Sequence, residues 1–178
     1  MATWTIGAVS VTRVEEQIGF ASFPPEQYLA GFERTLLQKH LPWLVPHHYS
    51  PEHDRLVTSV HSWLIRTDRH TILLDCCGGN HKERPGLARF HQRDTPYLAR
   101  LRAAGAAPED IDIVLCTHLH ADHVGWNTML RDGRWVPTFR TPGTCSPAPR
   151  TNTAIRVATL RRTPTRSAAA PIATACCR

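Results

Sequence analysis

The sequence predicts an α/β fold, and three observations lead to this class. Two β-rich runs, 56–65 and 71–75, flank a polar turn at 67–70, which is typical of a hairpin. A helical repeat follows at 95–105, and residues 111–116 then form a nearly continuous apolar run, typical of a strand buried on both faces. Strand, helix and strand in this order predict a sheet with a helix packed on it.

The N-terminal part of the chain predicts strands followed by a helix. Apolar residues alternate loosely over residues 3–14, which indicates one or two opening strands. Residues 28–37 have the apolar spacing of an amphipathic helix, with Pro24 and Pro25 in its first turn. We expect this helix to end near Pro42.

The later elements carry clear start and stop signals. Thr95 is expected to cap the second helix, with Pro96 at its first position and Gly105 at its end. A turn at 132–133 then leads into strand-like sequence over 134–139. These elements complete one domain, because 178 residues suit a single core better than two.

The charge of the chain is concentrated at one end. The net charge is +6, yet residues 1–139 carry 14 basic residues against 15 acidic ones, whereas residues 140–178 carry seven arginines and no acid. A specific nucleic-acid binder is therefore not expected, because only the tail is basic. No apolar run reaches the roughly 20 residues of a membrane span, and no secretory signal opens the chain. We expect a cytoplasmic enzyme without a membrane partner.

The strongest functional signal follows the apolar run 111–116. Four side chains that can bind metals lie within six residues, namely His118, His120, Asp122 and His123. In extended backbone His118 and His120 project to the same side, so both can reach one cation. Asp122 and His123 lie past a turn and can face a second cation. Imidazole with carboxylate suits Zn²⁺, and Fe or Mn is also possible. A solvated His-rich loop is the simpler alternative, which this close spacing disfavours.

This His-x-His-x-Asp-His pattern after a hydrophobic strand resembles the metallo-β-lactamase superfamily of metal-dependent hydrolases. Upstream, Asp75 with Gly78 is similar to the strand of that family that ends in an Asp near a Gly. The wider sequence, from 59–62 to 126–127, most resembles the branch that contains quorum-quenching N-acyl homoserine lactonases. The resemblance implies an αββα sandwich, of which residues 1–139 would form the N-terminal half.

The resemblance also implies a role for each residue of the pattern. His118 and His120 would bind the first of two zinc ions, and Asp122 and His123 the second. Asp75 would orient a coordinating imidazole from behind. A metal-activated hydroxide would attack the carbonyl of an ester, lactone or amide in a small-molecule substrate, with Asp122 as the catalytic residue that handles a proton at the leaving group. Oligomeric state is left open.

The chain departs from the family pattern after residue 139. The family needs a third His, a bridging Asp and a last His downstream, but no His follows His123 and no acid follows Asp132. Residues 140–178 are rich in Thr, Ala, Arg and Pro and contain no aromatic residue, so we expect them to be disordered. We expect a truncated, lactonase-like hydrolase that is inactive alone.

Three explanations of this departure stay open. In the first, the segment 140–178 is an out-of-frame translation that begins after Phe139; compatible codons exist, and sequencing of the source DNA tests this explanation. In the second, the segment is a natural disordered basic tail. In the third, the chain is a fragment that meets its second half on another chain. The alternative function is accordingly a non-catalytic metal-binding half-domain that pairs with a partner chain.

Overall fold

The computed structural model describes residues 2–139, and six of its strands form one mixed sheet. The strand order is β1-β2-β4-β5-β6, with β3 paired to β4, and only β5 and β6 run parallel. The strands of this sheet are β1 (Thr3–Ile6), β2 (Val9–Phe20), β3 (Tyr49–Ser50), β4 (Arg55–Arg66), β5 (Thr71–Leu74) and β6 (Ile113–Leu115). The predicted α/β class is confirmed.

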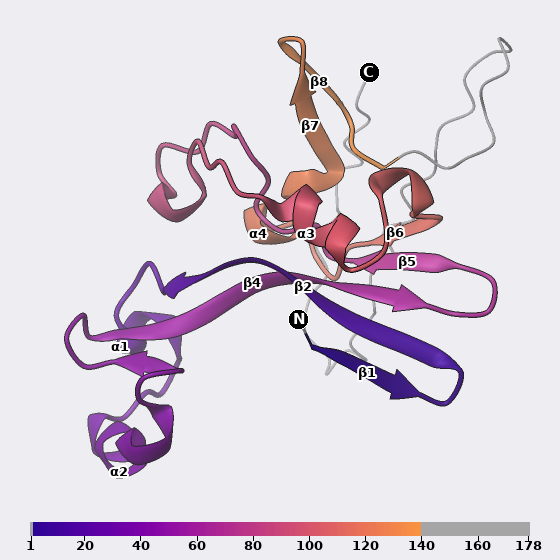
Figure 1. The fold of residues 1–178 in the computed structure, drawn as a ribbon. Coiled ribbons are helices and arrows are strands. Elements are labelled where there is room, and N and C mark those ends of the chain that lie inside the picture. The colour runs from indigo at the N-terminus through magenta and orange to yellow at the C-terminus, as the bar shows by residue number, and fades with distance from the viewer. Residues whose placement is uncertain (1, 140–178) are drawn as a thin grey trace, which may run out of the picture.

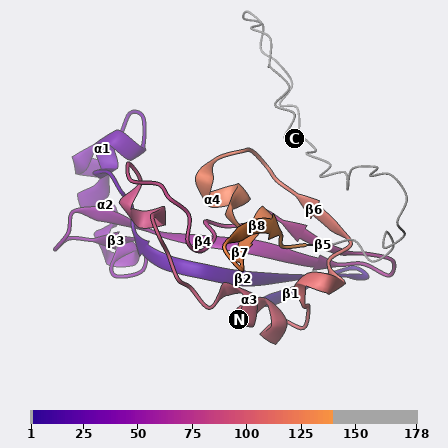
Figure 2. The same ribbon diagram turned by 90° about the horizontal axis from the view of Figure 1, so that it is seen from above.

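The helices lie at one end of the sheet and over one of its faces. They are α1 (Pro25–Tyr28), α2 (Arg34–Leu44), α3 (Tyr97–Ala103) and α4 (Ala121–Val124), with short 3-10 turns at Ala88–Phe90, Pro108–Asp110 and Gly125–Asn127. Figure 1 shows α1 and α2 at one end of the long strands, while α3 and α4 lie above the sheet, and Figure 2 labels β3 beside α2. Figure 2, turned by 90°, shows β2 and β4 running along most of the described part.

Two hairpins form at the places where the sequence has turn residues. The predicted hairpin is formed by β4 and β5, in antiparallel register from Trp63 opposite Leu74 to Arg66 opposite Thr71. A second hairpin joins β7 (Thr128–Arg131) to β8 (Arg134–Pro137). Its two turn residues have left-handed φ values of 51° and 73°, as a tight hairpin turn requires.

The core lies between α3 and the sheet. Tyr97 and Leu101 of α3 are fully buried, as are Val14 and Leu64 on the strands below. The Tyr97 ring stacks on Trp126 with centroids 5.3 Å apart. Through this stacking, α3 also supports the segment that follows α4.

The first helix differs from the sequence prediction. The region forms two helices, because Gly31 adopts a left-handed φ of 72° in the loop between them. Pro42 lies inside α2, which ends at Leu44, since a proline in the last turn removes only one helical hydrogen bond. Leu37 is the buried residue of this helix, whereas Trp43 is 62% exposed, so α2 contributes little to the core.

Two further expectations need correction. Pro96 is the residue before α3, and the Thr95 hydroxyl donates to Asn80 Oδ1 at 3.1 Å instead of capping the helix. Residues 111–116 contain only the three-residue strand β6, which is half-buried because it is the last strand in the sheet order. Gly105 follows the end of α3 with a φ of 87°, as predicted.

The expected disorder of residues 140–178 lies outside the described residues. Between residues 2 and 139, none of the helices combines the length and apolar character that crossing a membrane requires.

Candidate metal centre

The candidate site lies where the two parallel strands end. Leu74 of β5 is in register with Leu115 of β6, so the residues that follow both strands lie side by side. The Asp75 N–H donates to Leu115 O at 2.7 Å, which continues the pairing by one residue. Asp75 itself has a left-handed φ of 60°. This turn of the backbone brings its carboxylate to the start of the loop that contains the four predicted donors.

Asp75 is a nearly buried carboxylate that orders this loop. Its residue is 8% exposed. It accepts the Thr117 N–H at 2.8 Å and the Thr117 hydroxyl at 2.9–3.0 Å. Its Oδ2 lies 2.9 Å from His123 Nδ1. Because an ionised carboxylate only accepts hydrogen bonds, His123 carries its proton on Nδ1 and leaves the Nε2 lone pair open.

Thr117 extends this arrangement to a second histidine. Its Oγ1 lies 3.0 Å from His118 Nδ1. Since the hydroxyl proton goes to Asp75, the oxygen accepts from His118 Nδ1–H, and the Nε2 of His118 is left open as well. One carboxylate thus sets the tautomer of His123 directly and of His118 through Thr117.

His120 and Asp122 complete two pairs of donor atoms. His118 Nε2 lies 3.1 Å from His120 Nδ1, close to the about 3.3 Å between two ligands that lie about 2.0–2.1 Å from one tetrahedral ion. His123 Nε2 lies 3.5 Å from Asp122 Oδ2. The structure therefore brings His118 beside His120 and His123 beside Asp122. Among residues 2–139 no group of three or more His, Cys, Asp or Glu side chains is arranged to hold an ion.

The fit of these residues to zinc follows from the donor set. Three imidazoles and one carboxylate are ligands that Zn²⁺ accepts, and the open nitrogens of His118 and His123 face the other donor of their pair. The hydrogen bonds on the far side of both rings are the kind of outer support that zinc-binding histidines have in proteins.

The backbone behind the donors is closely packed. Cys76 N–H donates to His123 O at 2.7 Å, and Gly125 N–H donates to Cys77 O at 2.8 Å. A Cβ on Gly125 would lie 1.9 Å from Gly78 O, so only glycine fits there. The strand end at Asp75 and the end of α4 are therefore held in direct backbone contact.

Three buried thiols lie at the strand ends beside the site. Burial raises the pKa of the Cys76 thiol well above its ordinary value. The side-chain hydrogen bond with Cys76 lowers the pKa of Cys116 to about 7, and burial opposes this shift. Cys77 is buried as well, and its thiol pKa is raised by burial. These three cysteines are free thiols.

Sequence reasoning missed two residues around the site. Thr117 directly precedes His118, and this position next to the pattern is the one sequence signal for its role. Glu16 lies in β2, far away in sequence, and its carboxylate contacts both backbone segments behind the site. No local pattern marks such a residue.

Comparison with known proteins identifies the family. The sequence model of the Metallo-beta-lactamase superfamily matches residues 55–151, more than half of the chain. The chain therefore belongs to this superfamily of metal-dependent hydrolases. Ribonuclease Z of Mycobacterium sp. strain KMS is 33% identical over 78 residues, and strain JLS gives the same values. The match covers 44% of this chain and 21% of the relative, so the chain spans about one fifth of that protein.

Two solved structures share the fold. The hydrolase AbOPH of the beta lactamase superfamily has a TM-score of 0.55 and 24% identity, over 77% of this chain and 40% of that one. A probable metal-dependent hydrolase from Staphylococcus aureus has a TM-score of 0.56 and 22% identity, over 71% of this chain and 43% of that one. At these identities the likeness concerns the fold alone.

Proposed function

We propose that this chain provides a binuclear zinc site of a hydrolase. His118 and His120 bind one ion, and Asp122 and His123 bind the other. The observation that carries the proposal is which ring nitrogen is used: His123 Nδ1 bonds to Asp75 and His118 Nδ1 bonds to Thr117, which leaves open the two Nε2 atoms that face the second donor of each pair. Fe and Mn are alternative metals for the same imidazole and carboxylate donors.

The chemistry divides between the ions and the protein. Bound zinc ions supply a nucleophile at neutral pH by lowering the pKa of water and polarise a carbonyl oxygen. Asp75 and Thr117 hold the imidazoles in the required tautomer. The Asp122 side chain is 38% exposed, and we assign it the transfer of a proton to the leaving group.

We propose an ester, lactone or amide of small size as the substrate, with a lactone as the first compound to test. Membership of a superfamily of hydrolases supports the reaction class. Beyond His123 the sequence contains no histidine and a single carboxylate, Asp132. Four donors fill only half of two coordination spheres, so we expect this chain alone to bind zinc with little turnover.

The test combines zinc binding with hydrolysis. The purified full chain is titrated with Zn²⁺ in competition with a chromogenic chelator, and hydrolysis of a chromogenic lactone is followed with and without zinc. Zinc binding that is lost in His120→Ala supports the site, whereas absence of binding overturns it. Lactone hydrolysis that disappears in the same variant supports a catalytic chain.

A second candidate is a non-catalytic metal-binding half-domain that pairs with a partner chain. The observation in its favour is an exposed apolar hollow on the sheet, lined by Trp4, Ile6, Val11 and Trp63. Trp4 is 47% exposed and Ile6 68% exposed. Zinc binding without hydrolysis, together with saturable binding of a partner that buries Trp63, would favour this candidate.

We also propose the cytoplasm as the location of the protein. The support is chemical: Cys76, Cys77 and Cys116 are free thiols, which persist in a reducing compartment.

A further inference from the structure

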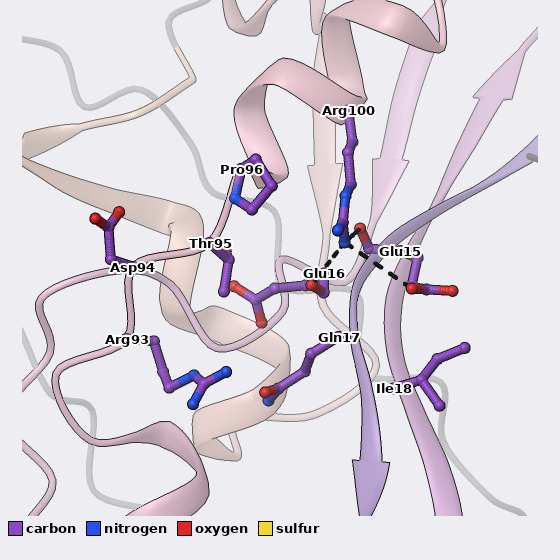
Figure 3. Close-up of a pocket in the computed structure, with 9 residues that line it drawn as sticks. All are labelled: Glu15, Glu16, Gln17, Ile18, Arg93, Asp94, Thr95, Pro96 and Arg100. Atoms are coloured by element: carbon purple, nitrogen blue, oxygen red, sulfur yellow. Dashed lines mark hydrogen bonds and ion pairs between the residues drawn. The ribbon is translucent and has the colours of Figure 1, made fainter.

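Glu16 is a buried carboxylate in the middle of β2. It is 3% exposed. Glu15 is in register with His61 and Gln17 with Val60, so Glu16 is the extra residue of a β-bulge. Such a bulge re-aims a side chain. Figure 3 shows Glu15 and Glu16 pointing to opposite sides of the strand. Glu16 lines a polar pocket of about 390 Å³.

Three donors point at this carboxylate. Its Oε2 accepts the Gly78 N–H at 2.7 Å, and its Oε1 accepts the Gly79 N–H at 3.0 Å and the Trp126 Nε1–H at 2.7 Å. Hydrogen bonds to an ionised acceptor are stronger than neutral ones. Arg100, which Figure 3 shows beside Glu15 and Glu16, donates to the backbone carbonyls of both residues rather than to the Glu16 carboxylate. Within residues 2–139 this carboxylate makes no ion pair, and it accepts hydrogen bonds from these three donors.

These donors belong to the two backbone segments behind the candidate metal centre. Gly78 and Gly79 follow Asp75 closely, and Trp126 comes three residues after His123. The position of each segment relative to the other decides whether Asp75 Oδ2 meets His123 Nδ1 at 2.9 Å. Glu16 is the side chain of a third element, β2, that binds both segments at once.

We propose that Glu16 is a positioning residue for zinc binding. Its carboxylate holds the segment after β5 against the segment after α4, and thereby sets the hydrogen bond through which Asp75 leaves the Nε2 of His123 open. This inference rests on the proposed function, because it assigns a role in forming that same site. Among residues 2–139 the Glu16 carboxylate makes no hydrogen bond or ion pair with His118, His120, Asp122 or His123, so its effect on them passes through Asp75.

The first experiment compares zinc affinity in Glu16→Gln and in the wild-type full chain. The amide replaces one accepting oxygen by a donor that faces N–H groups, so we expect zinc to bind about tenfold more weakly, at the lower end of the range for outer-shell partners. Thr12→Val is the matched control: Thr12 lies in the same strand, is 4% exposed and bonds Thr3 Oγ1. This control should keep its zinc affinity within about twofold.

A double-mutant cycle separates positioning from general support. If Glu16 acts through Asp75, Glu16→Gln should change zinc affinity by less than about twofold once Asp75→Asn is present. A purely structural role predicts that the two losses add. Additive losses, or an affinity of Glu16→Gln within about twofold of wild type, would overturn the proposal.

A milder variant keeps the test usable if Glu16→Gln does not fold. Trp126→Phe removes one of the three donors and keeps an aromatic ring, so zinc should bind about threefold more weakly, again only when Asp75 is intact. Unchanged affinity in this variant contradicts the inference. If the wild-type chain itself binds no zinc, the proposed function fails together with the inference. If wild type binds zinc and both variants equal it, only the role of Glu16 fails.

Discussion

The two halves of the candidate metal centre are held differently by the protein. The inner half, made of Asp75, Thr117 and His123, is hydrogen-bonded and largely buried, with the side chains of His123 and Asp75 25% and 12% exposed. The outer half, His118 with His120, is exposed, and its rings contact each other with centroids 4.4 Å apart. The comparison teaches that several hydrogen bonds fix the inner half in the fold, whereas the outer half is held by the Thr117 hydroxyl on His118 and by the contact between its own two rings.

Removing one histidine from each half should have the largest effect on zinc affinity and should show how the two halves differ in stability. We expect His123→Ala and His118→Ala each to weaken zinc binding by more than about 100-fold, beyond the effect of outer-shell partners. Only His123→Ala should also lower the free energy of unfolding, by about 1–3 kcal/mol, because the buried Asp75 loses a donor. His118→Ala should stay within about 0.5 kcal/mol of wild type. Chelator competition and urea unfolding measure the two effects, and equal stability losses would contradict the distinction.

Asp75→Asn should affect the outer half as well as the inner half, because Asp75 bonds His123 directly and reaches His118 through Thr117. The amide cannot accept from Thr117 and His123 at once as the carboxylate does. We expect zinc affinity to fall by about 10–100-fold, with all four donor side chains still present. Titration of the full chain with Zn²⁺ checks this, and an affinity within about twofold of wild type would show that Asp75 has no role in orienting the imidazoles.

Thr117→Val should weaken zinc binding less, because it leaves the contact between Asp75 and His123 intact. The hydroxyl that joins Asp75 to His118 is lost, so we expect about a three- to tenfold loss of affinity. Thr117→Ser restores a hydroxyl and should recover most of it. The same competition titration measures both variants, and failure of serine to rescue would argue against the hydrogen bond.

Lys82 offers the smallest effect, outside both halves. Burial lowers the pKa of its ammonium from 10.5 to about 8, although it donates to Thr128 Oγ1 and lies 3.6 Å from the Trp135 ring centroid. Between pH 8 and 10.5 the unfolded chain therefore binds more protons at this site, so the burial cost of the charge is relieved and stability rises with pH. Urea unfolding at several pH values should show this contribution in wild type and not in Lys82→Met. Zinc affinity should be the same in both proteins. A difference would show that the β7–β8 hairpin, which Lys82 contacts, affects zinc binding.

The candidate donors could be proposed from the sequence because they are local. Four metal-competent side chains within six residues after a strand can be recognised without knowledge of the rest of the chain. Asp75 came from resemblance alone, since nothing near it in sequence indicates a partner in the loop. Glu16 could not be found at all, because its donors are 62 and 110 positions away and a bulge, rather than a periodic pattern, aims its side chain.

The fold was predicted where turns and long patterns agree, as in the β4–β5 hairpin. The prediction was wrong where a single residue or the place of a strand in the sheet overrides the local pattern. Apolar spacing over residues 28–37 predicted one helix, but Gly31 introduces a left-handed backbone that divides it. The apolar run 111–116 predicted a fully buried strand, while the last place in the sheet order leaves β6 half-buried.

The hydrogen bond between Glu16 and Trp126 has a consequence for the order of events during synthesis. It closes a loop of 110 residues, and such distant contacts form after local ones because the entropy of closing the loop is lost first. While a ribosome is still extending the chain towards residue 126, β2 and β4 can already pair, but the Glu16 carboxylate lacks its indole partner. The histidines are thus synthesised before the contacts behind them are complete, so the proposed zinc site would be completed late in folding.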